Sequence, residues 1–348
     1  MSVTLLSREA SGDAAPRRPV PLRLFVLLLG IVVLVAVAGL SVAFGTRVVG
    51  WNEIVSAFTT GSDGIAEAAV RQRVPRTVLA MLVGASLGVA GAVLQGLTRN
   101  PLADPMILGI TPGASLAVVS GIAFFGLSSA TGYIWVAIVG AALASAFVYT
   151  IGSLGRGGPT PLKLALSGAA TTAAFTSLIS AILLPRIDVM NAFRFWQVGG
   201  VGGASYGKIA QALPFLIVGA VLCLACVRGL NTLALGDELA VGLGERVILT
   251  RIIAFVGAVT LCGAATAVAG PIAFVGLVVP HICRLLIGVD HRWLLASAAL
   301  LGATLLTVAD ILGRIVARPS EIDVGIVTAI IGAPFFIYVV RRQKARAL

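Results

Sequence analysis

Ten apolar runs, separated by short polar stretches, constrain the fold of this chain more than any other feature of its sequence. A bilayer's hydrocarbon core is about 30 Å thick, so a crossing helix needs roughly 20 apolar residues. Only 11% of the 348 residues are charged, whereas soluble domains average about 25%. The sequence therefore predicts an all-α polytopic membrane protein of about ten transmembrane helices. The runs lie at about 24–44, 77–97, 106–126, 133–154, 162–184, 206–228, 250–270, 272–287, 293–317 and 324–341.

The domain organisation follows from the same runs. Residues 1–20 are polar and predict a cytoplasmic tail, whereas 21–348 predict a single membrane domain. The first run is long enough to span, which favours a transmembrane helix over a cleaved signal peptide. Lys and Arg are more frequent in the loops on the side of both termini than on the opposite side. We therefore expect a multi-pass protein of the cytoplasmic (inner) membrane with both termini in the cytoplasm.

Two runs carry signs of interruption. The run at 272–287 is short, and Thr111-Pro112-Gly113 breaks the run at 106–126. Broken helices are tolerated in membranes only where protein or a water-filled cavity shields the freed backbone groups, so both segments are candidates for the pathway wall. The spacings Gly84-xxx-Gly88 and Gly109-xxx-Gly113 predict close approach between helices.

Several function classes lose support. Residues Gly202 to Lys208 fit the spacing of a phosphate loop, but Ile209 stands where Ser or Thr must hold Mg²⁺. Cys223 and Cys226 have CxxC spacing without a neighbouring His, and the chain has two histidines in all. We expect no enzyme activity, no metal site and no cofactor bound by this chain. The net charge of +11 is spread over loops and tails, which indicates contact with membrane lipid rather than nucleic acid.

One acidic residue lies deep in an apolar run. Asp310 precedes Arg314 by four residues, so the two can pair on one helix face. A structural ion pair is the favoured interpretation. An energy-coupling acid stays open, because intramembrane acids mark the pathways of proton- or ion-driven transporters. The alternative function is therefore a stand-alone secondary transporter or channel.

Motifs along the chain resemble, in order, those of the permease family of iron–siderophore, haem and vitamin B12 importers, the type II ABC importers. The segments that carry the resemblance are Arg73–Thr77 (RVPRT), Leu82–Ser86 (LVGAS), Gly91–Gln95 (GAVLQ), Arg99–Pro105 (RNPLADP), Leu233–Asp237 (LALGD) with Gly244, Gly270–His281 (GPIAFVGLVVPH) and Gly325–Phe335 (GIVTAIIGAPF). The resemblance implies the membrane subunit of an importer that moves an iron chelate by alternating access. A ferric siderophore is the favoured cargo, and haem and cobalamin stay open.

The resemblance also implies partners. These are two cytoplasmic ABC ATPase subunits that use ATP and Mg²⁺, a second permease (a copy or a paralogue), and an extracytoplasmic substrate-binding protein. Arg73, Arg76 and Arg314 match the outward arginines that receive acidic residues of the binding protein. Exposed Arg–carboxylate pairs of this kind steer docking and fix its register. The alternative is that Arg73 and Arg76 are interfacial anchors that reach the lipid headgroups.

Residues 234–247 are expected on the inner side, as a short amphipathic piece between glycines. A short amphipathic segment of this kind can dock into a groove of a soluble partner. By resemblance, residues 234–247 are the coupling segment that contacts the ATPase. The alternative is a loop helix lying on the lipid. The predicted coupling residues are Leu235, Gly236, Asp237, Glu238, Leu239, Gly242, Leu243 and Gly244.

The predicted pathway residues form two groups. Polar residues in or beside the apolar runs are candidates for the pathway wall: Gln95, Asn100, Thr111 and Ser115. By resemblance, the turn between the fourth and fifth spans narrows the cytoplasmic exit. Family members carry small hydroxyl residues at this turn, and this chain has Thr160 beside Pro161.

Overall fold

The computed structural model describes residues 18–59, 64–106, 108–154 and 161–344, which form fourteen helices and, within those ranges, no strand. The prediction of an all-α membrane fold is therefore confirmed. The helices are α1 (Val20–Ala43), α2 (Trp51–Thr59), α3 (Ile65–Thr98), α4 (Ile110–Phe125), α5 (Ala130–Ser153), α6 (Pro161–Leu183), α7 (Ile187–Gln197), α8 (Tyr206–Ala225), α9 (Val227–Leu233), α10 (Asp237–Gly242), α11 (Val247–Ala269), α12 (Val275–Ile287), α13 (His291–Val316) and α14 (Val324–Lys344).

Each of the ten apolar runs is a helix. Seven helices are long and apolar enough to cross a membrane. The other three runs are the shorter apolar helices Ile110–Phe125, Val275–Ile287 and Val324–Val339. The structure adds α2, α7 and α9, which the runs did not predict.

The 34-residue helix α3 is the central element of the bundle and packs against α13, α11 and α12. Its contact with α13 is made backbone to backbone. A Cβ added to Gly84 would overlap the carbonyl oxygen of Gly302, and one added to Gly88 would overlap that of Ala298. The close approach predicted for these two glycines is therefore confirmed, and its basis is small residues on both helices.

A second backbone contact joins α4 and α5. A Cβ on Gly113 would overlap Ala144 and approach the carbonyl oxygen of Gly140, and a Cβ on Gly140 would approach that of Gly113. Gly109 lies at the start of α4 in the left-handed region, with φ of 73°. The two glycines of the second predicted pair therefore have different roles. Gly113 allows α4 and α5 to pack closely, and Gly109 supplies the left-handed backbone at the start of α4.

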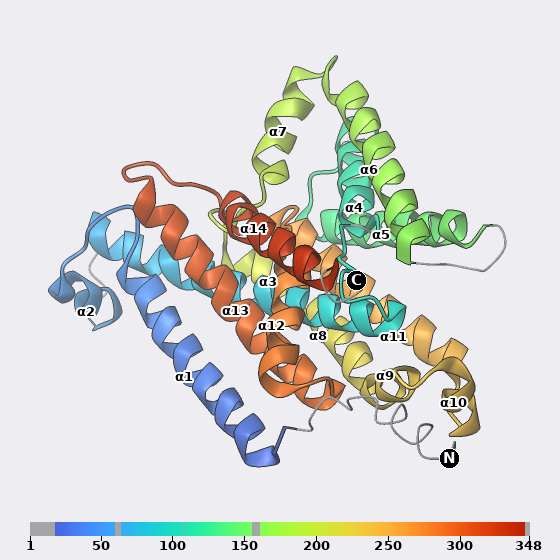
Figure 1. Ribbon diagram of the computed structural model, residues 1–348. Coiled ribbons are helices and arrows are strands. Elements are labelled where there is room, and N and C mark those ends of the chain that lie inside the picture. The colour runs from blue at the N-terminus through green and yellow to red at the C-terminus, as the bar shows by residue number, and fades with distance from the viewer. Residues whose placement is uncertain (1–17, 60–63, 107, 155–160, 345–348) are drawn as a thin grey trace, which may run out of the picture.

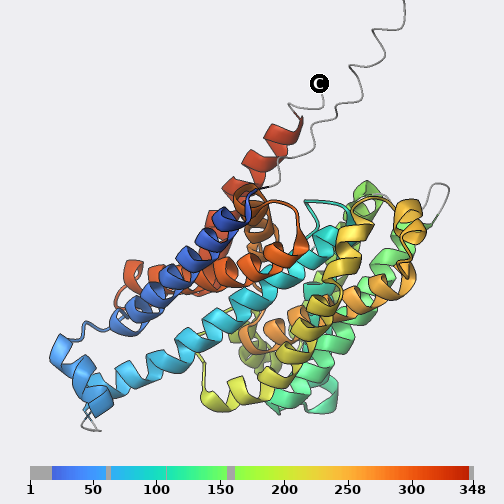
Figure 2. The ribbon, with the colours of Figure 1, turned by 90° about the horizontal axis from the view of Figure 1, so that it is seen from below.

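Figure 1 places α2 and α10 at opposite ends of the bundle, and Figure 2 shows the same separation from below. The start of α3 and the end of α13 lie at the α2 end, and the end of α3 and the start of α11 lie at the α10 end. Helix α1 runs along the outside and exposes apolar side chains over most of its length. This surface suits contact with lipid.

Candidate functional site

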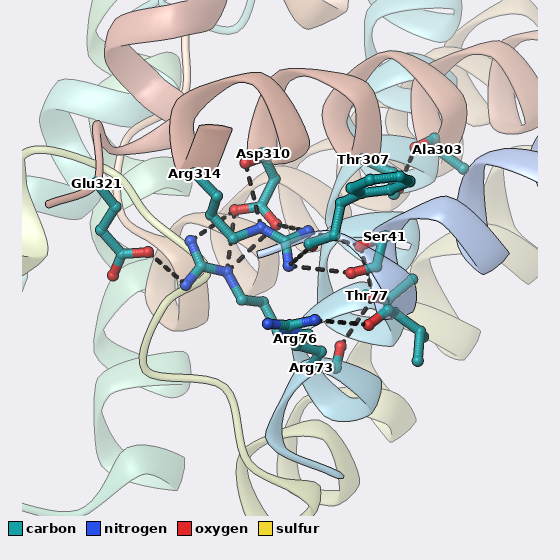
Figure 3. Close-up of polar contacts among 11 residues, drawn as sticks. Ser41, Arg73, Arg76, Thr77, Ala303, Thr307, Asp310, Arg314 and Glu321 are labelled. Carbon is teal, nitrogen blue, oxygen red and sulfur yellow. Dashed lines mark hydrogen bonds and ion pairs between the residues drawn. The ribbon is translucent and has the colours of Figure 1, made fainter. Parts of the chain in front are cut away.

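Charged residues cluster at the α2 end, where α3, α13 and the connection from α13 to α14 meet (Figure 3). Arg76 donates from Nε and Nη2 to Asp310 Oδ1, at 3.0 and 2.8 Å. Its remaining terminal nitrogen, Nη1, donates to Glu321 Oε2 at 2.7 Å. The guanidinium of Arg76 therefore bridges a buried carboxylate and an exposed one, and each end of the bridge is a charge-assisted hydrogen bond.

Arg314 binds the other side of the same carboxylate. Its Nη2 lies 2.9 Å from Asp310 Oδ2, which confirms the predicted i, i+4 ion pair. Arg314 also donates to the carbonyl oxygens of Ser41 and Phe44, at 3.0 and 3.1 Å. Asp310 is 1% exposed and pairs with two arginines. Such a burial is tolerable because the charge is compensated and hydrogen-bonded on both sides.

Arg73 binds backbone carbonyls at the end of α1 and just beyond it instead of a carboxylate. It donates to the carbonyl oxygens of Val42, Ala43 and Arg47 at 3.1, 2.7 and 2.7 Å. The last carbonyls of a helix lack intrahelical partners and carry partial negative charge, so a cation there is favourable. Arg318 binds the carbonyl oxygen of Gly45 in the same way.

The three predicted docking arginines differ in exposure. Arg73 and Arg314 are 6% and 2% exposed, and their bonds go to the chain itself. The side chain of Arg76 is 13% exposed and that of Glu321 is 41% exposed. The outward edge of this network is thus the pair Arg76–Glu321. The docking role of Arg73, Arg76 and Arg314 stays a prediction, and these contacts give Arg73 and Arg314 a structural role as well.

The coupling segment lies at the α10 end and contains the short helix α10. Gly236, with φ of 115°, precedes the helix, and Gly244, with φ of 82°, follows it. Both values lie in a region that only glycine adopts readily. Leu235, Leu239 and Leu243 are 58%, 61% and 64% exposed. The segment therefore has the predicted form, a glycine-bounded helix with apolar side chains toward the outside.

Asp237 ties this segment to the bundle. Its carboxylate forms ion pairs with Arg99, the residue after α3, and with Arg251 of α11, at 2.9 Å for the latter. Sequence reasoning missed both arginines as partners of Asp237. Helix periodicity offers no signal for them, because the three residues lie on different elements.

The predicted pathway residues are engaged within the chain. Gln95 is buried, and it donates to the carbonyl oxygen of Gly276 at 3.1 Å and accepts from Arg284. Asn100 accepts from the N–H of Leu102. Thr111 and Ser115 are buried neighbours on α4, with Ser115 donating to the Thr111 carbonyl. Thr160 lies outside the described residues, and Pro161 begins α6. The pathway role of all six residues stays a prediction.

Asp104 is a buried acid that the sequence analysis did not single out. It lies between α3 and α4, is 7% exposed, and accepts a hydrogen bond from the Met106 N–H at 2.8 Å. Burial raises the pKa of this carboxyl to about 6, and the Met106 bond opposes the shift only in part. Within the part of the chain that the structure describes, no arginine or lysine pairs with this carboxyl, in contrast to Asp310.

We expect Asp104→Asn to raise the melting temperature at pH 8 and to raise it much less at pH 4.5. The folded pKa lies above the unfolded value of about 3.9, so ionisation disfavours the folded state as pH rises through about 6. Asn keeps the acceptor for Met106 and removes the charge. Thermal unfolding of the purified detergent-solubilised chain at both pH values measures the effect. An equal shift at the two pH values would contradict it.

The comparisons with known proteins agree with this architecture. Residues 31–342 match the FecCD transport family. The chain belongs to the FecCD transport family. It is 46% identical to the iron(3+)-hydroxamate import system permease protein FhuB of Bacillus subtilis over 78% of the chain and 71% of FhuB. It is 42% identical to the ferric enterobactin transport system permease protein FepD of Escherichia coli over 96% of the chain and 98% of FepD.

A solved structure supports the fold of this FecCD chain. An inward-facing conformation of a metal-chelate type ABC transporter superposes with a TM-score of 0.76 at 28% identity, covering 92% of this chain and 99% of that one. The resemblance read from the motifs is confirmed, and so is the function of an ABC importer permease. The stand-alone transporter or channel loses its support. Membership of this family implies ATPase and substrate-binding partners and a dimer of permeases.

Proposed function

We propose that this chain carries a ferric siderophore across the cytoplasmic membrane, together with a second permease, two ABC ATPase subunits and a substrate-binding protein. The observation that carries the proposal is the similarity to permeases named for ferric chelate import, which is near full-length for the ferric enterobactin permease and covers 78% of this chain for the iron(3+)-hydroxamate permease. Both cargoes present ferric iron inside an organic chelate. Haem and cobalamin remain the alternatives to be excluded by transport.

In the proposed orientation the α10 end faces the cytoplasm and the α2 end faces outward. The excess of Lys and Arg on the side of both termini supports it. So does the coupling segment 234–247, whose exposed leucines lie between the spanning helices α8 and α11 in the chain and need a protein partner to cover them. A soluble ATPase supplies such a partner.

Coupling then follows from the contacts of Asp237. ATP binding draws the two ATPase subunits together and moves α10. Because Asp237 pairs with Arg99 and Arg251, a movement of α10 is passed to the ends of α3 and α11. Helix α3 is continuous from this end to the arginine network. A rigid helix with both ends engaged can link the two faces of the membrane during alternating access.

Co-purification tests the coupling segment. We expect the wild-type chain, isolated in mild detergent, to retain an ABC ATPase, and Leu239→Ser to reduce its recovery at least tenfold while membrane insertion stays normal. The matched control is Leu184→Ser, which makes the same change at an exposed leucine of the opposite end. Equal loss in both variants, or in neither, would contradict the assignment of α10.

Transport tests the cargo. The reconstituted complex should accumulate ⁵⁵Fe from a ferric hydroxamate only when ATP and the binding protein are both present. Uptake of haem or cobalamin in place of the ferric chelate would overturn the cargo. Uptake driven by a proton gradient without ATP would overturn the importer mechanism.

A further inference from the structure

We propose that Glu321 is a resident competitor for docking: its carboxylate occupies the outward edge of Arg76, and an acidic side chain of the substrate-binding protein displaces it. The inference rests on the proposed function, because it takes docking at the α2 end as given. It adds a statement about the permease before docking: its outward arginine, Arg76, is already paired with Glu321. The network in Figure 3 shows the arrangement, with Arg76 between Asp310 and Glu321.

The geometry leaves one edge of Arg76 for a partner. Nε and Nη2 face Asp310, which is 1% exposed and therefore out of reach of another protein. Nη1 faces Glu321 at 2.7 Å. Glu321 is 41% exposed and lies in the connection between α13 and α14. A carboxylate arriving from outside meets Arg76 where Glu321 already binds it.

The two other arginines of the network do not offer an equal edge. The terminal nitrogens of Arg73 bind carbonyl oxygens at the end of α1 and just beyond it, and those of Arg314 bind Ser41, Phe44 and Asp310. Releasing either one would leave backbone carbonyls at the end of α1 without partners. Releasing Glu321 from Arg76 leaves a carboxylate that water can solvate, so this exchange has the smaller penalty.

Local charge favours exchange over simple addition. Asp323 lies in the same connection, and burial together with the nearby negative charge of Glu321 raises the pKa of its carboxyl. A further carboxylate at the outward edge of Arg76 would therefore approach both Glu321 and Asp323, while the exposed Arg318 of the same connection is bound to the Gly45 carbonyl oxygen. Neighbouring carboxylates repel one another, so the incoming acid binds Arg76 well only as Glu321 leaves.

The test uses the full importer in nanodiscs and its purified substrate-binding protein. We expect Glu321→Gln to bind the binding protein about five- to tenfold more tightly than wild type at 50 mM salt. The variant gains an ion pair on docking, whereas wild type exchanges one pair for another. Its affinity should therefore fall more steeply as salt is raised to 500 mM. Gln is isosteric and half exposed here, so folding is expected to be retained.

The matched control is Asp188→Asn, which removes one negative charge from an exposed position in the first turn of α7, outside the network. It should leave the affinity within about twofold of wild type. An equal gain in the control would show a general effect of surface charge and overturn the proposal. Unchanged or weaker binding of Glu321→Gln, with normal wild-type docking, would also overturn it.

Failure of the proposed function has a different signature. If the wild-type importer does not bind the substrate-binding protein at any salt concentration, docking itself is wrong. If wild type binds and Glu321→Gln binds no more tightly, docking stands and Glu321 is not a competitor. Binding measured by surface plasmon resonance separates the two cases in one experiment.

Discussion

Replacing Gly84 by leucine is expected to abolish recovery of folded protein. The backbones of α3 and α13 touch at this position, because a Cβ on Gly84 would overlap the carbonyl of Gly302 and crowd Leu306. Overpacking of a core typically destabilises by about 1–3 kcal/mol when side chains can yield. Here the obstacle is backbone, so the two helices must separate. The measurement is the monodisperse yield in size-exclusion chromatography and the melting temperature.

The control for this prediction is Gly39→Leu. Gly39 lies in the spanning helix α1, is exposed, and has no atom within 4 Å of an added Cβ. The same substitution should therefore be nearly neutral there. A Gly84→Leu protein with wild-type melting temperature would mean that α3 and α13 are not packed as described.

Asp310→Ala is expected to be the most destabilising change in the arginine network. It leaves Arg76 and Arg314 without the carboxylate between them, and removing one partner of a buried pair typically costs about 3–5 kcal/mol. Asp310→Asn, which keeps an acceptor oxygen but removes the charge, should be less damaging. Thermal unfolding of the purified variants measures both.

Glu53→Ala is the control at the same end of the bundle. Glu53 is an exposed acid of α2 that accepts a hydrogen bond from the Gly50 N–H. Its removal should lower stability by less than about 1 kcal/mol. A stable Asp310→Ala protein that had lost only transport would contradict the structural role of Asp310 and would support a role in the transport pathway.

The sequence predicted most of the fold because the spanning helices are specified locally. An apolar run of sufficient length forms a helix in a membrane whatever its neighbours are. Helices α2 and α7 were missed because they are short and mixed in polarity, as Glu53 and Asp188 in their first turns illustrate. The coupling segment was predicted because its glycines and leucines lie within a few residues of one another.

The charged network shows the limit of this reasoning. The pair Asp310–Arg314 could be predicted, since four residues of helix place both side chains on one face. The pair Arg76–Asp310 could not, because 234 residues separate its members. The motif indicated arginines at the outer rim but not that Arg73 and Arg314 are buried against the end of α1. Nor did it indicate Glu321 on Arg76.

The sequence by itself therefore determined that the chain lies in a membrane, where its long apolar helices run, and which importer family it belongs to. Hydrophobic runs and the order of motifs are properties of the linear sequence, so they can be recognised without a structure. Only the tertiary structure decided which arginine keeps an outward edge, which acids compensate the buried charges, and how Asp237 connects α10 to α3. Those answers depend on side chains that meet through helix packing, and packing is decided by glycines whose partners lie on other helices.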